Sequence, residues 1–99
     1  MTHYQVEVLD EAAQEFQDAF HWYFKRSPMA AQAFREEVFA AIDALGENAD
    51  LWPKDVTELH FRVLDRFPYT LHYELSGSLA TVVAIAHQHR RPGYWRARR

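Results

Sequence analysis

The spacing of hydrophobic residues constrains the fold of this chain more than any other feature, because it changes twice along the sequence. Hydrophobic and polar residues alternate over residues 3–9, which is typical of a half-buried strand. Hydrophobic residues then recur at three- and four-residue steps up to Leu45, as on one face of a helix. From Leu59 the alternation returns. The sequence therefore predicts one strand, then a helical region, then a group of strands.

The helical region divides at Ser27-Pro28. The residue before a proline resists helical geometry, whereas Ser is a good amino cap and Pro is tolerated in the first helical turn. We therefore expect a hairpin of two helices, the first capped by Asp10 and the second ended by Gly46. The apolar stripes contain Ala12, Phe16, Ala19, Phe20, Tyr23 and Phe24 in the first helix, and Ala31, Phe34, Val38, Ala41, Ile42 and Leu45 in the second.

A loop is predicted over residues 47–58, because this stretch is polar and contains Pro53. Leu51 and Trp52 are expected to pack from this loop against the core. A second strand is predicted over residues 59–64. In this strand Leu59, Phe61 and Val63 alternate with His60, Arg62 and Leu64.

Two further strands are predicted over residues 69–75 and 79–86, joined by a hairpin turn at Ser76-Gly77-Ser78. The last strand is almost wholly apolar, which indicates a central strand that is covered on both faces. The predicted fold class is therefore α+β, in the order β-α-α-β-β-β. We expect one domain over residues 1–99, with the helical hairpin on one face of a small, mostly antiparallel sheet and the first strand at its edge.

The charges are unevenly distributed along the chain. Residues 1–86 contain six basic and fourteen acidic side chains, whereas residues 87–99 contain five arginines and no acid. Such a basic tail either meets a partner or is simply solvated. The chain has no cysteine, its amino terminus lacks the pattern of a signal peptide, and no segment approaches the length of a membrane span. We therefore expect a cytoplasmic protein without a membrane partner.

Three stretches resemble the RelE/ParE toxin superfamily, in its ParE-like, plasmid-stabilisation branch. They are AAQEFQDAFHWYFKRSPMAAQAF in the helical hairpin, LHFRVLDRFPYTLHYEL in the middle strands, and VVAIAHQHRRPGYWRAR at the end of the chain. The resemblance implies the toxin of a type II toxin-antitoxin system, neutralised by a cognate antitoxin whose disordered tail folds over the hairpin and sheet. It implies DNA contact only through the antitoxin.

Aromatic residues are the expected antitoxin contacts, since a small domain with so many of them leaves some exposed. The candidates are Tyr23, Phe24 and Trp52, although core packing is an alternative for each. An inactive toxin homologue that serves as a binding module also remains open. A helix-turn-helix DNA-binding module is disfavoured, because no helix has a basic face.

The superfamily offers two kinds of target. ParE-like members bind DNA gyrase, whereas RelE-like members cut mRNA on the ribosome. A metal-free ribonuclease needs an acid, a base and arginines close together. The chain could supply Arg62, Arg66, His87, His89 and Tyr94 for that purpose. The acidic body favours the gyrase alternative, because docking into ribosomal RNA needs broad basic cover.

In the gyrase alternative, the tail supplies the target contacts. The candidate residues are Arg90, Arg91, Tyr94, Trp95, Arg96 and Arg98. For Tyr94 and Trp95 the alternative is a place in the core. Arg62 has a structural alternative as well, a cross-strand pair with Glu74. His87 and His89 lack a clear third metal ligand, so neither a metal site nor a cofactor is expected.

Overall fold

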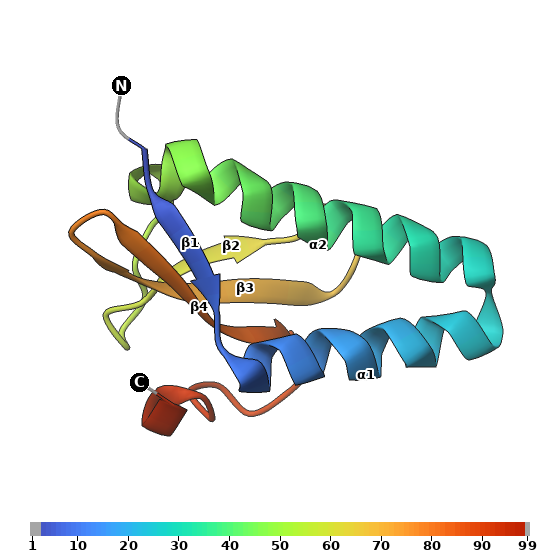
Figure 1. Ribbon diagram of the computed structural model, residues 1–99. Helices are drawn as coiled ribbons and strands as arrows, with labels where there is room; N and C mark the ends of the chain where they lie inside the picture. The colour runs from blue at the N-terminus through green and yellow to red at the C-terminus, as the bar shows by residue number, and fades with distance from the viewer. Residues whose placement is uncertain (1–2, 99) are drawn as a thin grey trace.

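Two long helices form a hairpin against one face of a four-stranded sheet in the computed structural model, which describes residues 3–98 (Figure 1). The elements are β1 (Gln5–Val8), α1 (Asp10–Arg26), α2 (Pro28–Asn48), the short 3-10 helix η1 (Ala49–Leu51), β2 (His60–Val63), β3 (Tyr69–Ser76), β4 (Leu79–His87) and the 3-10 helix η2 (Arg96–Arg98). The α+β class and the predicted order of elements are confirmed. Within the described residues, no helix is both long and apolar enough to cross a membrane.

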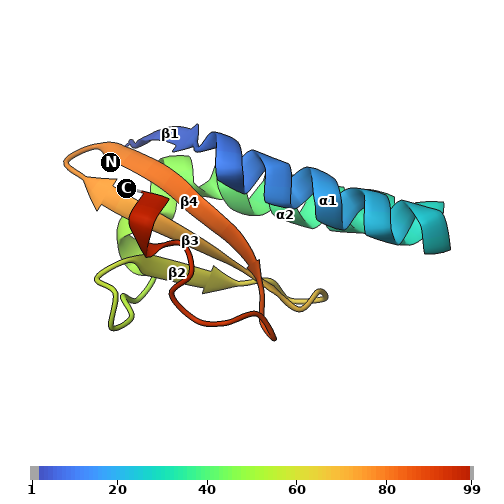
Figure 2. The ribbon, with the colours of Figure 1, turned by 90° about the horizontal axis from the view of Figure 1, so that it is seen from below.

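The strand order is β1-β4-β3-β2, with β1 parallel to β4 and the other pairs antiparallel. The first strand therefore lies at an edge and the last strand is central, as predicted. β4 is buried on both faces because the helices pack on one side of it and the end of the chain packs on the other (Figure 2). Gly77 takes a positive φ of 59° in the tight β3–β4 turn, a conformation that glycine adopts without strain.

The helix boundaries confirm one predicted cap and correct two other expectations. Ser27 accepts a hydrogen bond from the Ala30 N–H (3.2 Å), so it caps α2 as expected. Asp10 is not a cap. The Leu9 N–H donates to the Val82 carbonyl (3.0 Å), which keeps Leu9 extended, and the Leu9 carbonyl accepts from Ala13. The helix therefore begins at Asp10 itself.

Gly46 does not end α2, which continues to Asn48. A glycine ends a helix when it takes a positive φ, and Gly46 does not. Its carbonyl instead accepts the Tyr4 N–H (2.7 Å), which ties the start of the chain to the last turns of the helix.

The expectation that Leu51 and Trp52 pack against the core is half right, because Trp52 does so while Leu51 is 75% exposed.

The core consists of two clusters, one on each face of the sheet. The larger cluster lies under the helices and contains Phe16, Phe34, Leu45, Leu71 and Tyr73. The smaller cluster lies on the opposite face and contains Leu59, Val83, Ala84, Ala86 and Trp95. A register shift beside His72 puts Val83 and the next residue of β4 in the same cluster. The sheet is thus covered on both sides by parts of a short chain.

Candidate functional site

The end of the chain folds back along the side of the sheet away from the hairpin (Figure 2). We call residues 88–98 the C-terminal strap. Trp95 is its anchor in the core, because its indole stacks on the His72 ring with a centroid distance of 3.8 Å and is only 5% exposed. Trp95 was expected on an exposed contact surface. The structure instead gives it the alternative role, that of a core residue.

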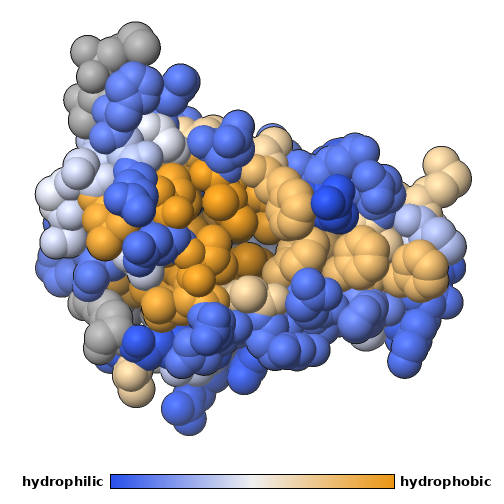
Figure 3. Space-filling view, viewed as in Figure 1, coloured by the Kyte–Doolittle hydropathy of each residue, from blue (hydrophilic) through white to orange (hydrophobic). Residues whose placement is uncertain are grey.

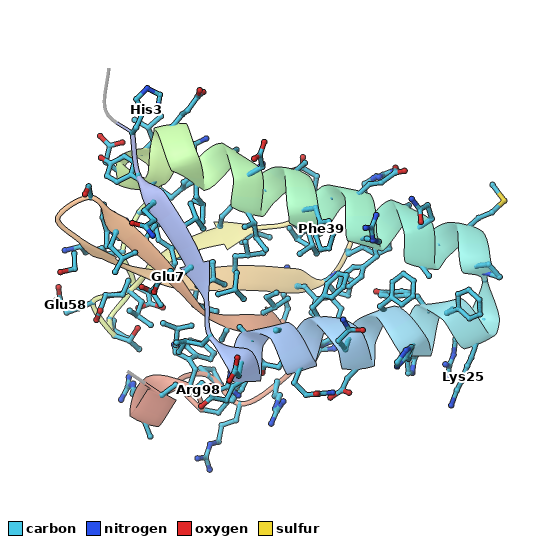
Figure 4. The ribbon with its side chains drawn as sticks, viewed as in Figure 1. His3, Glu7, Lys25, Phe39, Glu58 and Arg98 are labelled. Carbon is cyan, nitrogen blue, oxygen red and sulfur yellow. The ribbon has the colours of Figure 1, made fainter. Side chains whose placement is uncertain are left out.

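The strap also meets α1 at Glu15, a carboxylate whose side chain is only 12% exposed. Its oxygens accept hydrogen bonds from the Arg98 guanidinium (2.8 and 3.2 Å) and from the Tyr94 hydroxyl. Burial and the bond to Glu15 raise the pKa of Tyr94, and the same carboxylate raises the pKa of Arg98. Figure 4 shows Arg98 beside the first turns of α1. Sequence reasoning missed Glu15, although it borders the apolar stripe of the helix, three residues after Ala12 and four before Ala19.

Glu15 also completes the edge of β4. β1 pairs with β4 only as far as Val82, so the next amides of this edge have no strand partner. The Ile85 N–H donates to Glu15 (3.0 Å), and the Arg98 guanidinium donates to the Val83 carbonyl (3.2 Å). Side chains thus supply the partners that a longer first strand would have supplied.

A cleft of about 520 Å³ opens between α1, the start of β3, the end of β4 and the strap. Its walls are mainly aromatic, and both Arg90 and His87 lie in its lining. The aromatic residues are Trp22, Tyr23, Tyr69 and Tyr94. Arg90 lies over the Tyr94 ring (4.0 Å) and 3.7 Å from Glu15. Aromatic rings with a cation beside them suit an anchoring side chain of a protein partner.

The residues proposed for a ribonuclease converge only in part, because His87 and Tyr94 line the same cleft whereas Arg62 and Arg66 lie elsewhere. Arg62 belongs to the edge strand β2 and lies on the helix-covered face of the sheet, opposite to the strap, where its guanidinium lies over Trp52 (4.7 Å). Arg66 pairs with Glu37 on α2 (3.7 Å). His87 and His89, by contrast, lie beside each other at the end of β4, with ring centroids 5.2 Å apart. The two arginines are therefore engaged by Trp52 and Glu37, whereas Tyr94 is bound to Glu15.

The alternative cross-strand pair is also wrong, because the residue opposite Arg62 on β3 is Leu71, whereas Glu74 lies opposite Thr81. The β2–β3 register determines these partners, since it places His60 opposite Tyr73 and therefore Arg62 opposite Leu71. Arg62 therefore shares the helix-covered face with Leu71, where one of its guanidinium nitrogens is buried without a hydrogen-bond partner among residues 3–98.

The strap arginines divide into two groups. Arg90 and Arg98 both lie beside Glu15, whose single negative charge offsets part of theirs. Arg91 and Arg96 are exposed and form no ion pair with a described residue. Arg99 lies outside the described residues. The cationic surface that the strap offers to a target therefore centres on Arg91 and Arg96.

The aromatic residues expected to bind an antitoxin are not gathered in one place. Tyr23 is half-buried between Phe34 and Phe67 (ring centroids 5.2 and 5.1 Å), and Trp52 is half-buried under Arg62. Only Phe24 is well exposed, at 53%. Tyr23 and Trp52 therefore offer only part of their surfaces to a partner.

A continuous apolar surface runs between the two helices and beside β1, as Figure 3 shows. We call it the hairpin groove and define it by Val8, Phe20, Phe24, Phe39 and Ile42. Figure 4 shows Phe39 directed into the space between the helices, and its ring contacts Phe16 (5.3 Å). The sequence signal was present, because Phe39 is an aromatic residue that lies off the predicted apolar stripe of its helix.

The pairing of His72 with Trp95 predicts a pH dependence of stability. Burial lowers the pKa of His72 from 6.5 to about 4, although the Asp55 and Glu15 carboxylates act in the opposite direction. The unfolded chain therefore binds the proton more readily, and the free energy of unfolding should fall as the pH drops from 6.5 toward 4, by roughly 3 kcal/mol. Urea unfolding at several pH values measures this fall. In His72→Phe the fall should be smaller by that amount, and equal falls in the two proteins would contradict the assignment.

Comparison with known proteins agrees with this architecture. A family model described as the ParE toxin of type II toxin-antitoxin system, parDE, matches residues 6–92. A solved structure from the chromosomal ParDE TA system of P. aeruginosa is similar, with a TM-score of 0.76 and 16% sequence identity. That match covers 86% of this chain and 96% of the other, so the two share a fold. No curated protein matches this sequence.

Proposed function

Because this chain belongs to the ParE toxin family of type II toxin-antitoxin systems, we propose that it is a toxin that a cognate antitoxin neutralises and that acts by binding DNA gyrase. The proposal places it in the cytoplasm, with both partners. Two surfaces have to be assigned, one for the antitoxin and one for the target.

The hairpin groove is the surface best suited to the antitoxin. It is longer than a single pocket, apolar along its length, and open at its centre, where Phe39 is 44% exposed. A disordered segment that becomes an amphipathic helix or an extended strand on binding can cover such a surface. Phe24, one of the expected contacts, lies in this groove, next to Phe20 (ring centroids 6.1 Å).

The observation that favours gyrase over mRNA is the separation of Arg62 and Arg66 from the other nuclease candidates. Arg62 and Arg66 lie on the β2 side of the sheet, whereas Tyr94 is bound to Glu15 beside α1. General acid-base cleavage of RNA needs these groups within hydrogen-bond reach of one phosphate. Binding to a protein target needs only an accessible surface, and the exposed Arg91 and Arg96 provide a cationic one.

Induction of the chain without its antitoxin separates the two targets. We expect growth arrest with a DNA-damage response, together with inhibition of purified gyrase in a supercoiling assay. The double variant Arg91→Glu/Arg96→Glu should lose most of this inhibition, while Lys25→Glu, an exposed charge reversal at the end of α1, should retain it. Primer extension on translated messages tests the nuclease alternative. Cleavage within ribosome-bound codons, lost in His87→Ala, would establish the nuclease alternative instead.

A further inference from the structure

The position of the strap depends on side chains rather than on a backbone ladder. The Gln88 N–H donates to the Pro68 carbonyl (2.8 Å), but the backbone hydrogen bonds recorded beyond it stay local, within three residues along the chain. Arg96, for example, donates to the Gly93 carbonyl (3.1 Å). A segment without ladder bonds is held only as well as its side-chain contacts hold it.

Those side-chain contacts converge on Glu15. Tyr94 and Arg98 donate to its two oxygens, and Arg90 lies within 4 Å of it. Because the carboxylate is nearly buried, it requires these donors, and an ionised group left there without them would be costly. The strap and Glu15 therefore stabilise each other.

We propose that Glu15 is a positioning residue that fixes the strap on the domain and thereby orients Arg91 and Arg96 toward the target. The fixing of the strap follows from the contacts alone, whereas the role of the two arginines rests on the proposed function. Trp95 keeps one point of the strap in the core, and Glu15 determines the direction of the chain on either side of it, through Tyr94 before it and Arg98 after it.

The variant that tests this role is Glu15→Gln. Glutamine keeps an oxygen that can accept the Ile85 N–H, so the edge of β4 stays satisfied, but it removes the charge that holds Arg98 and Arg90. The matched control is Glu47→Gln, an exposed glutamate on α2 at the other side of the molecule from the strap. Tyr94→Phe removes a single donor and serves as a second, milder variant.

The native chain has no cysteine, so a nitroxide label at Ala97→Cys reports on the strap alone. Ala97 is exposed and lies between the two arginines of η2. In the parent and in Glu47→Gln we expect the electron paramagnetic resonance spectrum of the label to show a single, slow-motion component. In Glu15→Gln we expect a fast component, and amide exchange in residues 93–98 that is faster by about tenfold or more. Tyr94→Phe should show a smaller shift in the same direction.

Unchanged spectra and exchange in both Glu15→Gln and Tyr94→Phe would overturn the proposal. The proposal would also be overturned if Glu15→Gln destabilised the whole domain rather than the strap alone. Faster amide exchange in α2 and weaker binding to the antitoxin would reveal such a general loss of stability. If the label becomes mobile while the gyrase inhibition by Arg91→Glu/Arg96→Glu equals that of the parent, the anchor stands and the proposed target surface fails. The two hypotheses therefore fail in different measurements.

Discussion

Phe39→Asp should abolish neutralisation of the toxin while leaving its fold intact. The Phe39 ring lies at the centre of the hairpin groove and is 44% exposed, so in the monomer a carboxylate there still reaches water and costs mainly the contact with Phe16, whereas under a partner it is desolvated. Aromatic residues at the centre of an interface typically contribute ~2–4 kcal/mol, which corresponds to a loss of affinity of about 30- to 1000-fold. Titration calorimetry with the protein encoded by the adjoining reading frame measures this loss.

Two controls define the groove. Phe39→Leu keeps an apolar side chain and should cost no more than about tenfold in affinity. Met29→Asp places the same charge at the tip of the hairpin, on a residue that is 83% exposed and lies outside the groove, and should leave affinity near that of the parent. If Met29→Asp disrupts binding and Phe39→Asp does not, the antitoxin binds at the tip of the hairpin instead.

The fold could be predicted from the sequence because its determinants are local. The Ser27-Pro28 joint fixes the break between the helices, and the apolar run before His87 fixes the central strand. Each of these signals depends on residues close together in the chain, where backbone sterics and hydrophobic periodicity act. Where local signals misled, as at Asp10 and Gly46, a hydrogen bond from a distant segment decided the outcome.

The candidate site was less predictable because its contacts span most of the chain. Glu15 and Arg98 are 83 positions apart, and although Glu15 borders the apolar stripe of α1, no local pattern indicates that it pairs with the end of the chain. Likewise, Arg62 lies on the helix-covered face because of the β2–β3 register, which is set by pairing rather than by composition. Charge patterning identified the basic tail, but only the structure separates the paired arginines from the exposed ones.

Trp95→Ala should destabilise the domain by ~3–5 kcal/mol, a large part of the roughly 5–15 kcal/mol that stabilises a typical single domain. The indole covers the smaller core cluster, so its removal opens a cavity beside Leu59 and exposes the His72 ring. Deleting residues 94–99 should have a still larger effect, because it also leaves the buried Glu15 carboxylate without Tyr94 and Arg98. Urea unfolding followed by circular dichroism measures both losses.

The truncated chain should therefore lose toxicity because it unfolds, which makes truncation an unsuitable test of the tail as a contact surface. Trp95→Phe supplies the control, since a smaller ring still fills most of the site and should cost only about 1–2 kcal/mol. Arg96→Ala leaves the core untouched, so its free energy of unfolding should lie within about 0.5 kcal/mol of that of the parent. If Trp95→Ala unfolds at the same urea concentration as Arg96→Ala, the strap does not cover the sheet in solution, and Trp95 returns to the set of residues available for target contact.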